Sequence, residues 1–195
     1  MTRDAKQAVF LDRDGTINTD IGYLNTPDQV ELIPRAGAAI RLLNEAGFKT
    51  IVITNQAGIA KGLIQEQRVP DIHQKLVNLL KEDGARIDGF YYCPHHPEGV
   101  IEKYRIECQC RKPFPGMVLR AVNDFGIDLS CSFVIGDKSC DVELAHTVGA
   151  KAIMVMTGYG RIEFDRHTQA MLTPPDHTAA DLYDAVQWIL NDSVR

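Results

Sequence analysis

The stretch that decides the fold lies near the start of the chain and reads Ala8-Val9-Phe10-Leu11-Asp12-Arg13-Asp14-Gly15-Thr16. Four consecutive apolar residues are typical of a strand that is buried on both faces, as strands of a parallel sheet are. The polar residues that follow would lie just beyond the carboxyl end of this strand, where open parallel sheets bind their ligands. The stretch therefore predicts both the kind of sheet and the edge that carries a site.

Similar apolar runs recur along the chain and alternate with helical patterns. We expect further buried strands at residues 50–53, 90–93, 133–135 and 152–156. Apolar residues at helical spacing predict helices over residues 36–46, 66–82, 115–125, 139–148 and 179–190. Strands that alternate with helices predict an α/β fold, a Rossmann-like parallel sheet with helices on both faces. The stretch over residues 94–112 is too long for an ordinary connection, so something must order it.

The composition is that of an ordinary globular protein, and it narrows the choice of partners. Of the 195 residues, 45% are hydrophobic and 24% are charged, and the formal net charge is -5. A negative net charge disfavours nucleic acid and anionic membranes, so we expect a small-molecule partner. The apolar run at residues 8–11 is far too short for a signal peptide or a membrane span, which predicts a cytoplasmic protein. We expect one domain over residues 1–195, and a monomer.

Chemically active side chains follow the predicted strands. Asp12 and Asp14 follow the first strand, Thr54 the second and Asp137 the fourth, and Lys112 precedes the fourth. Residues two apart at a strand end project to the same side, so Asp12 and Asp14 can face one pocket if the extended geometry continues. Such close carboxylates repel each other unless a proton or a cation lies between them, and Asp137 would complete an oxygen cluster suited to Mg²⁺. With Lys112 as a positive charge and an aspartate as nucleophile, the pattern indicates phosphoryl transfer.

Each of these signals also has a structural alternative. Asp-x-Asp-Gly is common in turns, because both residue types suit turn geometry. Asp137 could cap a helix that begins near Ser139, and Lys112 by itself would be interpreted as a solvated surface lysine. Their placement after the appropriate strands of one sheet favours a shared site over these separate explanations.

The long irregular stretch carries a pattern of cysteine and histidine. Cys93-x-His95 and Cys108-x-Cys110 offer three thiolates and an imidazole, a ligand set that suits a closed tetrahedral zinc site over residues 93–110. The gap is one residue where zinc sites more often have two, so the spacing alone leaves ordinary buried cysteines as an alternative. Two further cysteines are interpreted as small core or turn residues, Cys131 and Cys140. Four histidines are interpreted as surface or helix-face residues: His73, His146, His167 and His177.

Four segments resemble the signature motifs of haloacid dehalogenase superfamily phosphatases. They are residues 10–16 (FLDRDGT), Thr54-Asn55-Gln56, Lys112-Pro113, and Gly136-Asp137-Lys138 with Asp141. More narrowly, three segments are similar to the D-glycero-D-manno-heptose-1,7-bisphosphate 7-phosphatase family: residues 54–62 (TNQAGIAKG), 92–97 (YCPHHP) and 108–113 (CQCRKP). The resemblance spans residues 9–158 and implies a fold of the haloacid dehalogenase type. Lys61 stands where the family more often has arginine.

The resemblance implies a role for each residue of the expected site. Asp12 would be the nucleophile and would carry an aspartyl-phosphate. Asp14 would protonate the departing sugar oxygen and then activate the hydrolytic water. Mg²⁺ would be held by Asp12, Asp137 and the backbone carbonyl of Asp14, while Thr54 and Lys112 would stabilise the phosphoryl oxygens.

The same resemblance implies zinc in addition to magnesium. The Zn²⁺ ligands would be Cys93, His95, Cys108 and Cys110. His95 rather than His96 fits the Cys-x-His pattern. A loop pinned by zinc would hold Arg111 and Lys112 over the phosphate site.

The motifs are separated by no insertion large enough for a cap domain, so we expect an open pocket bordered by loops. The candidates for substrate contact are Asp20, Ile21, Gly22, Tyr23, Asn55, Arg111 and Lys112. The implied activity is hydrolysis of the 7-phosphate of a heptose bisphosphate. The alternatives are a histidinol-phosphate phosphatase, which shares the aspartates and the zinc loop, and a zinc-stabilised binding protein without turnover. Residues 58–62 and 97–107 look more like the heptose enzyme, and a binding module has no requirement for Asp14.

Overall fold

The computed structural model describes residues 6–170 and 172–192, and one six-stranded sheet lies at its centre. The strand order is β3-β2-β1-β4-β5-β6, and every neighbouring pair is parallel. The strands are β1 (Ala8–Leu11), β2 (Lys49–Asn55), β3 (Gly89–Cys93), β4 (Phe133–Gly136), β5 (Lys151–Val155) and β6 (His177–Ala179). The prediction of a parallel sheet is confirmed.

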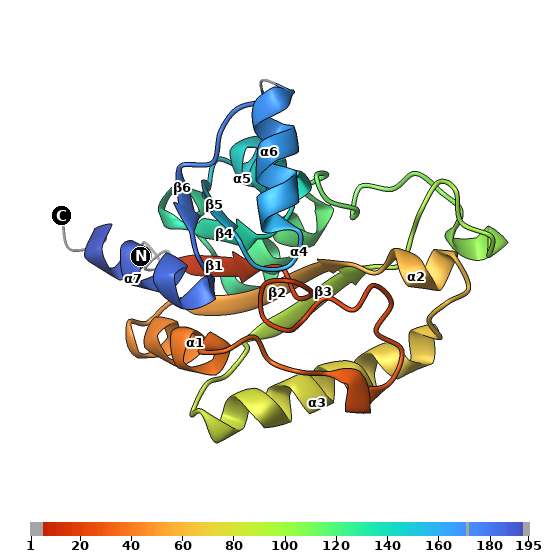
Figure 1. Cartoon of the computed structure of the whole chain (residues 1–195), viewed down its shortest axis with the longest axis horizontal. Helices are drawn as coiled ribbons and strands as arrows, with labels where there is room; N and C mark the ends of the chain where they lie inside the picture. The colour runs from red at the N-terminus through yellow and green to blue at the C-terminus, as the bar shows by residue number, and fades with distance from the viewer. Residues whose placement is uncertain (1–5, 171, 193–195) are drawn as a thin grey trace.

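Helices cover both faces of the sheet (Figure 1). The helices are α1 (Ala36–Glu45), α2 (Ala57–Ala60), α3 (Val69–Glu82), α4 (Gly116–Phe125), α5 (Ser139–Val148), α6 (Gly160–Gln169) and α7 (Leu182–Asp192). Side chains of α1, α3 and α7 share one core cluster, and side chains of α4 and α5 share the other. The strands divide between the two clusters by alternation, so that in β1 Val9 and Leu11 face the first and Ala8 and Phe10 face the second. Both faces of β1 are therefore dry, as its four apolar residues predict.

The structure corrects several predicted elements. Residues 177–179 form β6, so the last helix begins at Leu182 rather than at residue 179. The helix predicted from residue 66 begins with a 3-10 turn at Glu66–Arg68, and α3 follows with Pro70 in its first turn, where proline is tolerated. Strand β3 is only half-buried, because it forms an edge of the sheet. The short α2 and the polar α6 were not predicted.

The irregular stretch between β3 and α4 is held by contacts along its length, and we call residues 94–112 the long loop. Its helical content is one 3-10 turn, Glu102–Tyr104. The amide of Ile101 donates to the carbonyl of Ala60 at 2.9 Å, and the Tyr104 hydroxyl donates to Glu66. These contacts fasten the middle of the loop to α2 and to the 3-10 turn that precedes α3. None of the described helices is long and apolar enough to cross a membrane.

Candidate active site

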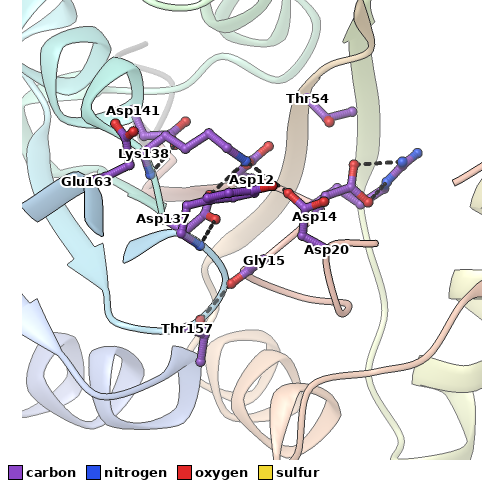
Figure 2. A network of polar contacts seen from close by, with 12 residues as sticks. Asp12, Asp14, Gly15, Asp20, Thr54, Asp137, Lys138, Asp141, Thr157 and Glu163 are labelled. Atoms are coloured by element: carbon purple, nitrogen blue, oxygen red, sulfur yellow. Dashed lines mark hydrogen bonds and ion pairs between the residues drawn. The ribbon is translucent and has the colours of Figure 1, made fainter. Parts of the chain in front are cut away.

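Three buried carboxylates meet at the carboxyl ends of the two central strands, and we call them the carboxylate cluster. Asp12 follows β1, Asp137 follows β4, and Asp141 lies in the first turn of α5. One oxygen from each lies within 4.8 Å of the other two. The pairing of β1 with β4 brings them together, because the amide of Asp12 donates to the carbonyl of Ile135 at 2.9 Å. Figure 2 shows the three side chains converging.

The carboxylate cluster is electrostatically incomplete without a cation. Burial and the charge of Asp12 raise the pKa of Asp137 to about 7, and burial raises the pKa of Asp141 to about 6. Oδ1 of Asp137 is fully buried and has no hydrogen-bond partner among the described residues, although Nζ of Lys138 lies 3.3 Å from it. Hard oxygen ligands of this kind suit Mg²⁺. The residues present therefore fit the predicted magnesium ion.

Lys112 lies inside the carboxylate cluster rather than at the surface. Its Nζ is 2.8 Å from Asp12 and 2.6 Å from Asp141, and it donates to the carbonyl of Ile53 at 2.9 Å. Burial alone would lower the pKa of Lys112, but the charges of Asp12 and Asp141 outweigh it and raise the pKa. The alternative of a solvated lysine is wrong, because only 4% of the residue is exposed.

Asp137 is not a helix cap, so that alternative is also wrong. The N-cap position of α5 is occupied by Lys138, whose amide donates to Oδ2 of Asp141 at 3.3 Å. Oδ2 of Asp137 instead accepts a hydrogen bond from the amide of Tyr159 at 2.9 Å. The side chain that caps this end of the helix is therefore that of Asp141, in the first turn of α5.

The side chain of Asp14 is directed away from the carboxylate cluster (Figure 2). It accepts hydrogen bonds from Arg13 at 3.1 and 2.7 Å, from Asn18 at 2.9 Å and from Gln56 at 3.0 Å. Burial would raise the pKa of Asp14, but the charge of Arg13 and these hydrogen bonds outweigh it and lower the pKa. Asp12 and Asp14 thus border the same cleft but belong to two separate polar networks.

The residues that follow β2 connect these networks. Thr54 is buried, and its hydroxyl accepts a hydrogen bond from the Gln56 amide at 2.9 Å. The same amide nitrogen donates to Asp14, so Gln56 links a predicted phosphate ligand to the predicted acid. The side chain of Asn55 forms a two-way clamp on the backbone of Lys112, with hydrogen bonds of 3.0 and 3.2 Å. Asn55 therefore also places Lys112, in addition to bordering the cleft.

A cleft of about 470 Å³ opens above these groups and is lined by most of the predicted substrate contacts. Six of the seven line it: Asp20, Gly22, Tyr23, Asn55, Arg111 and Lys112. Ile21 is not among the lining residues, and 48% of it is exposed. Its neighbours turn the chain, because Gly22 has a φ of 87° and its amide donates to Asp20 at 2.7 Å. Contact of Ile21 with substrate therefore stays a prediction that the lining of the cleft does not support.

Sequence reasoning missed other residues that line the cleft. Lys138 contacts Asp20 at 3.2 Å as well as Asp137, and Tyr159 borders the cleft beside it. Asp141 is not among the lining residues, and although it belongs to the fourth motif, the sequence pattern indicates no role for it. Tyr159 lies just beyond the carboxyl end of β5, so the rule that identified Asp12 and Asp137 applies to it too.

Gly15 is required by the close approach of Asp137. It has a φ of 85°, and a Cβ at this position would lie 2.2 Å from Oδ2 of Asp137. Any side chain would therefore collide with the carboxylate cluster and strain the backbone. Gly15 is therefore needed both for the backbone turn and for the space that the Asp137 carboxylate occupies.

The four predicted zinc ligands converge beside the cleft, and we call them the sulfur cluster. Their ligand atoms, from Cys93, His95, Cys108 and Cys110, all lie within 4.8 Å of one another. The three sulfurs are separated by 3.2 to 3.5 Å, and Nδ1 of His95 lies 3.3 Å from the sulfur of Cys110. A tetrahedral zinc with Zn–S distances of about 2.3 Å would place its sulfurs about 3.8 Å apart. The arrangement fits a closed zinc site.

Burial makes the sulfur cluster unfavourable as a set of bare thiolates. It raises the pKa of Cys93, where hydrogen bonds between Cys93 and the neighbouring cysteines act in the same direction. Burial also raises the pKa of Cys110, while the pKa of Cys108 is lowered because hydrogen bonds from both other cysteines outweigh burial. Since zinc binds thiolates, a dication would supply the missing charge.

The sulfur cluster is joined to the cleft through Arg111. This residue follows Cys110 directly and lines the cleft. Nη1 of Arg111 donates to the backbone carbonyl of His95 at 3.4 Å. Displacement of His95 or Cys110 would therefore move a cation at the cleft wall. His96 is not among the lining residues, and its Nδ1 accepts from the amide of Glu98 at 3.1 Å.

Two of the histidines interpreted as surface or helix-face residues are buried. His73 is packed beside Arg13, with Nε2 3.4 Å from Nη1 of the arginine. His167 contacts the carbonyl of Thr173 at 2.6 Å. Cys140, interpreted as a core or turn residue, also lines the cleft. Sequence spacing could not show these contacts, because the partners come from other elements.

Comparison with known proteins identifies similar sequences over nearly the whole chain. A family model described as HAD-hydrolase-like matches residues 109–185. The D-glycero-D-manno-heptose-1,7-bisphosphate 7-phosphatase of Chlorobaculum tepidum is 44% identical over 189 residues, which covers 94% of this chain and 94% of that protein. The D-glycero-beta-D-manno-heptose-1,7-bisphosphate 7-phosphatase of Escherichia coli is 40% identical and covers 94% of this chain and 88% of its own length.

A solved structure agrees with these sequence relatives. The D,D-heptose 1,7-bisphosphate phosphatase from B. bronchiseptica, complexed with magnesium and phosphate, superimposes with a TM-score of 0.84 and 30% identity. The match covers 95% of this chain and 99% of that chain. The similarity therefore includes the sheet, both layers of helices and the long loop.

Proposed function

The chain belongs to the D-glycero-D-manno-heptose-1,7-bisphosphate 7-phosphatase family of the haloacid dehalogenase superfamily, and on that premise we propose that it hydrolyses the 7-phosphate through an aspartyl-phosphate on Asp12. The chain is thus a phosphomonoester hydrolase. The observation that carries the residue assignment is the burial of Asp12 against Lys112, with Asp137 and Asp141 beside them. This arrangement places a nucleophile and a cation for phosphate in one cleft, with buried carboxylates that suit a metal directly beside them.

We assign the first chemical step to Asp12 and Asp14. A carboxylate oxygen of Asp12 forms a bond to phosphorus as the bond from phosphorus to the sugar oxygen breaks. Asp14 must first take up a proton, because Arg13 and its other donors lower its pKa in the substrate-free protein. It then gives this proton to the sugar oxygen, because an alkoxide is a poor leaving group. Water then attacks the aspartyl-phosphate, Asp14 takes the proton from the water, and inorganic phosphate leaves with Asp12 restored.

The charge on the phosphoryl oxygens is offset by side chains that the fold already holds in place. Nζ of Lys112 and the Thr54 hydroxyl are buried at the base of the cleft. Asp141 keeps Lys112 directed toward Asp12, since its carboxylate lies 2.6 Å from Nζ. Preorganised groups of this kind stabilise the transition state without moving during the reaction.

Magnesium is the ion that these carboxylates fit, and the solved relative was obtained with magnesium and phosphate. Asp12, Asp137 and the backbone carbonyl of Asp14 would hold it. When bound, it neutralises phosphate charge next to the nucleophile. Its positive charge would also offset the burial and the charge of Asp12 that together raise the pKa of Asp137.

We further propose that Zn²⁺ occupies the sulfur cluster and has a structural role. Four protein ligands, Cys93, His95, Cys108 and Cys110, leave no position for water or substrate. The hydrogen bond from Arg111 to the His95 carbonyl supports a link between this site and the cleft. Arg111 would then recognise sugar oxygens or the second phosphate, for which a forked guanidinium is suited.

The remaining proposals concern the state of the protein in the cell. We propose a monomer of one domain in the cytoplasm, with a phosphorylated sugar as its partner and neither nucleic acid nor membrane. The net charge of -5 supports the exclusion of polyanionic partners.

A direct test compares phosphate release from D-glycero-D-manno-heptose 1,7-bisphosphate and from histidinol phosphate, each with and without Mg²⁺. We expect rapid release of one phosphate from the heptose bisphosphate in the presence of Mg²⁺ and little without it. Faster turnover of histidinol phosphate would favour that activity instead. No release from either substrate would support a binding protein.

A further inference from the structure

Arg13 is a buried cation whose two sides contact different residues. Only 1% of it is exposed, which is unusual for arginine. Its Nε and Nη2 contact the two oxygens of Asp14 at 3.1 and 2.7 Å. Its Nη1 instead lies 3.4 Å from Nε2 of His73, a residue sixty positions away on α3.

The chemistry of the two side chains determines the direction of this contact. A guanidinium has five N–H donors and no acceptor, so Nε2 of His73 can serve only as the acceptor. The ring must then be neutral, with its proton on Nδ1. Burial and the charge of Arg13 lower the pKa of His73 to about 3, which keeps the lone pair of Nε2 available near neutral pH.

The ring of His73 is itself held by its neighbours. It stacks on Phe90 of β3, with ring centroids 4.5 Å apart and an angle of 20° between the planes. Tyr92 approaches edge-on with a centroid distance of 6.2 Å. Helix α3 and strand β3 therefore fix the orientation of the acceptor from outside the cleft.

We propose that His73 is a positioning residue for the acid and base of the reaction, because it fixes the plane of the Arg13 guanidinium and thereby the orientation of Asp14. This inference rests on the proposed role of Asp14. Asn18 and Gln56 also donate to Asp14, but each gives a single hydrogen bond to one oxygen, whereas Arg13 contacts both oxygens. The planar guanidinium of Arg13 defines the orientation of the Asp14 carboxylate. It can do so only if the guanidinium itself cannot turn.

The test compares His73→Phe with His73→Gln. Phenylalanine keeps the stacking on Phe90 but has no acceptor, whereas glutamine places an amide oxygen near the position of Nε2. His177→Phe is the matched control, because His177 also stacks on an aromatic ring, that of Trp188 at 4.6 Å, but on β6 away from the cleft. Thermal unfolding identifies variants that are not folded.

The informative readout is the first turnover on two substrates with different leaving groups. A sugar or other alkyl phosphate needs a proton from Asp14, whereas p-nitrophenyl phosphate does not. For His73→Phe we expect the first turnover of the alkyl phosphate to slow roughly tenfold, with KM nearly unchanged, because Asp14 is misplaced rather than lost. The nitrophenyl burst should change by less than about twofold, and His73→Gln should recover most of the alkyl rate.

Three results would overturn the inference: equal slowing on both substrates, no slowing in His73→Phe, or no recovery in His73→Gln. If His73→Phe does not fold, His73→Asn replaces it, because the shorter asparagine side chain cannot bring its amide oxygen within hydrogen-bond distance of Arg13. Addition of His73→Phe to Asp14→Asn should cost nothing further on the alkyl phosphate, and an additive loss would also count against the inference. If the heptose bisphosphate is not a substrate, the proposed substrate fails, but any alkyl phosphate that is turned over still tests His73.

Discussion

The carboxylate cluster and the sulfur cluster are both suited to a cation, but the protein holds them in different ways. The carboxylate cluster follows strands at the centre of the sheet and contains Lys112, so part of its charge is already balanced. The sulfur cluster joins the end of edge strand β3 to the long loop, and its side-chain contacts connect the ligands to one another. From this difference we infer that the fold alone holds the proposed reaction centre, whereas the ends of the long loop would depend on the proposed zinc ion.

The strongest test of this difference is Asp12→Asn, for which we expect complete loss of turnover in a folded protein. An amide cannot attack phosphorus and is a poor ligand for Mg²⁺. The unfolding temperature without Mg²⁺ should not fall, since the substitution removes one of three mutually repelling carboxylates and Lys112 keeps Asp141. Phosphate release and thermal unfolding are measured together. Turnover above a metal-free blank would contradict covalent catalysis at Asp12.

Asp14→Asn should slow turnover by about a hundredfold, the usual scale for loss of a positioned acid and base. Because the side chain of Asp14 lies outside the carboxylate cluster, the Mg²⁺ concentration for half-maximal activity should stay close to that of the wild type. The loss should be smaller for the first turnover of p-nitrophenyl phosphate. An equal loss on both substrates would remove the acid assignment, and a large shift in Mg²⁺ dependence would place the side chain at the metal.

Cys110→Ser should lower activity by roughly tenfold through displacement of Arg111, a magnitude typical of a misplaced group, while Asn55, Asp12 and Asp141 keep Lys112 in place. Serine is a poor ligand for zinc, so elemental analysis should show one zinc per chain in the wild type and less in the variant. Hydrogen exchange should increase at both ends of the long loop and remain low in β1 and β4. Cys131→Ser is the matched control, because Cys131 lies outside the sulfur cluster. A zinc-free variant with full activity would contradict the proposed dependence.

Arg111→Ala should reduce kcat/KM for the heptose bisphosphate several-fold and that for p-nitrophenyl phosphate by less than about twofold. The reason is that loss of a charge-assisted hydrogen bond lowers kcat/KM only for a substrate that forms this bond. Zinc content should be unchanged, because Arg111 contacts the backbone of His95 and not a ligand atom. Lys112→Ala is the comparison variant and should impair both substrates. Similar effects of Arg111→Ala on both would assign Arg111 to general phosphate binding.

The smallest expected effect is that of Glu66→Gln, which weakens the attachment of the long loop to the 3-10 turn that precedes α3. Glu66 accepts from Tyr104 and lies 3.7 Å from Nζ of Lys103. With zinc bound we expect activity within about twofold of the wild type, because exposed ion pairs contribute little. After a chelator has removed zinc, the variant should lose protection from hydrogen exchange over residues 96–104. The wild type should keep this protection. Equal protection in the two chelated proteins would show that Glu66 does not hold the loop.

Local sequence alone determined the central architecture. Four apolar residues before Asp12 predict a strand with two dry faces, and glycines after periodic apolar segments predict where helices end, as at Gly126 and Gly149. Such patterns depend on neighbours along the chain, so they could be recognised without the structure. The same patterns placed Asp12 and Asp137 at the correct edge of the sheet.

The tertiary structure decided which side chains meet at that edge. Residues 177–179 became a strand because β5 offered a free edge, which no local periodicity indicates. The side chain of Asp14 bonds to Arg13, Asn18 and Gln56 instead of joining the expected oxygen cluster. His73 contacts Arg13 although sixty residues separate them in the sequence. These outcomes depend on packing and charge balance between segments that are distant in the sequence. A local sequence pattern describes neither.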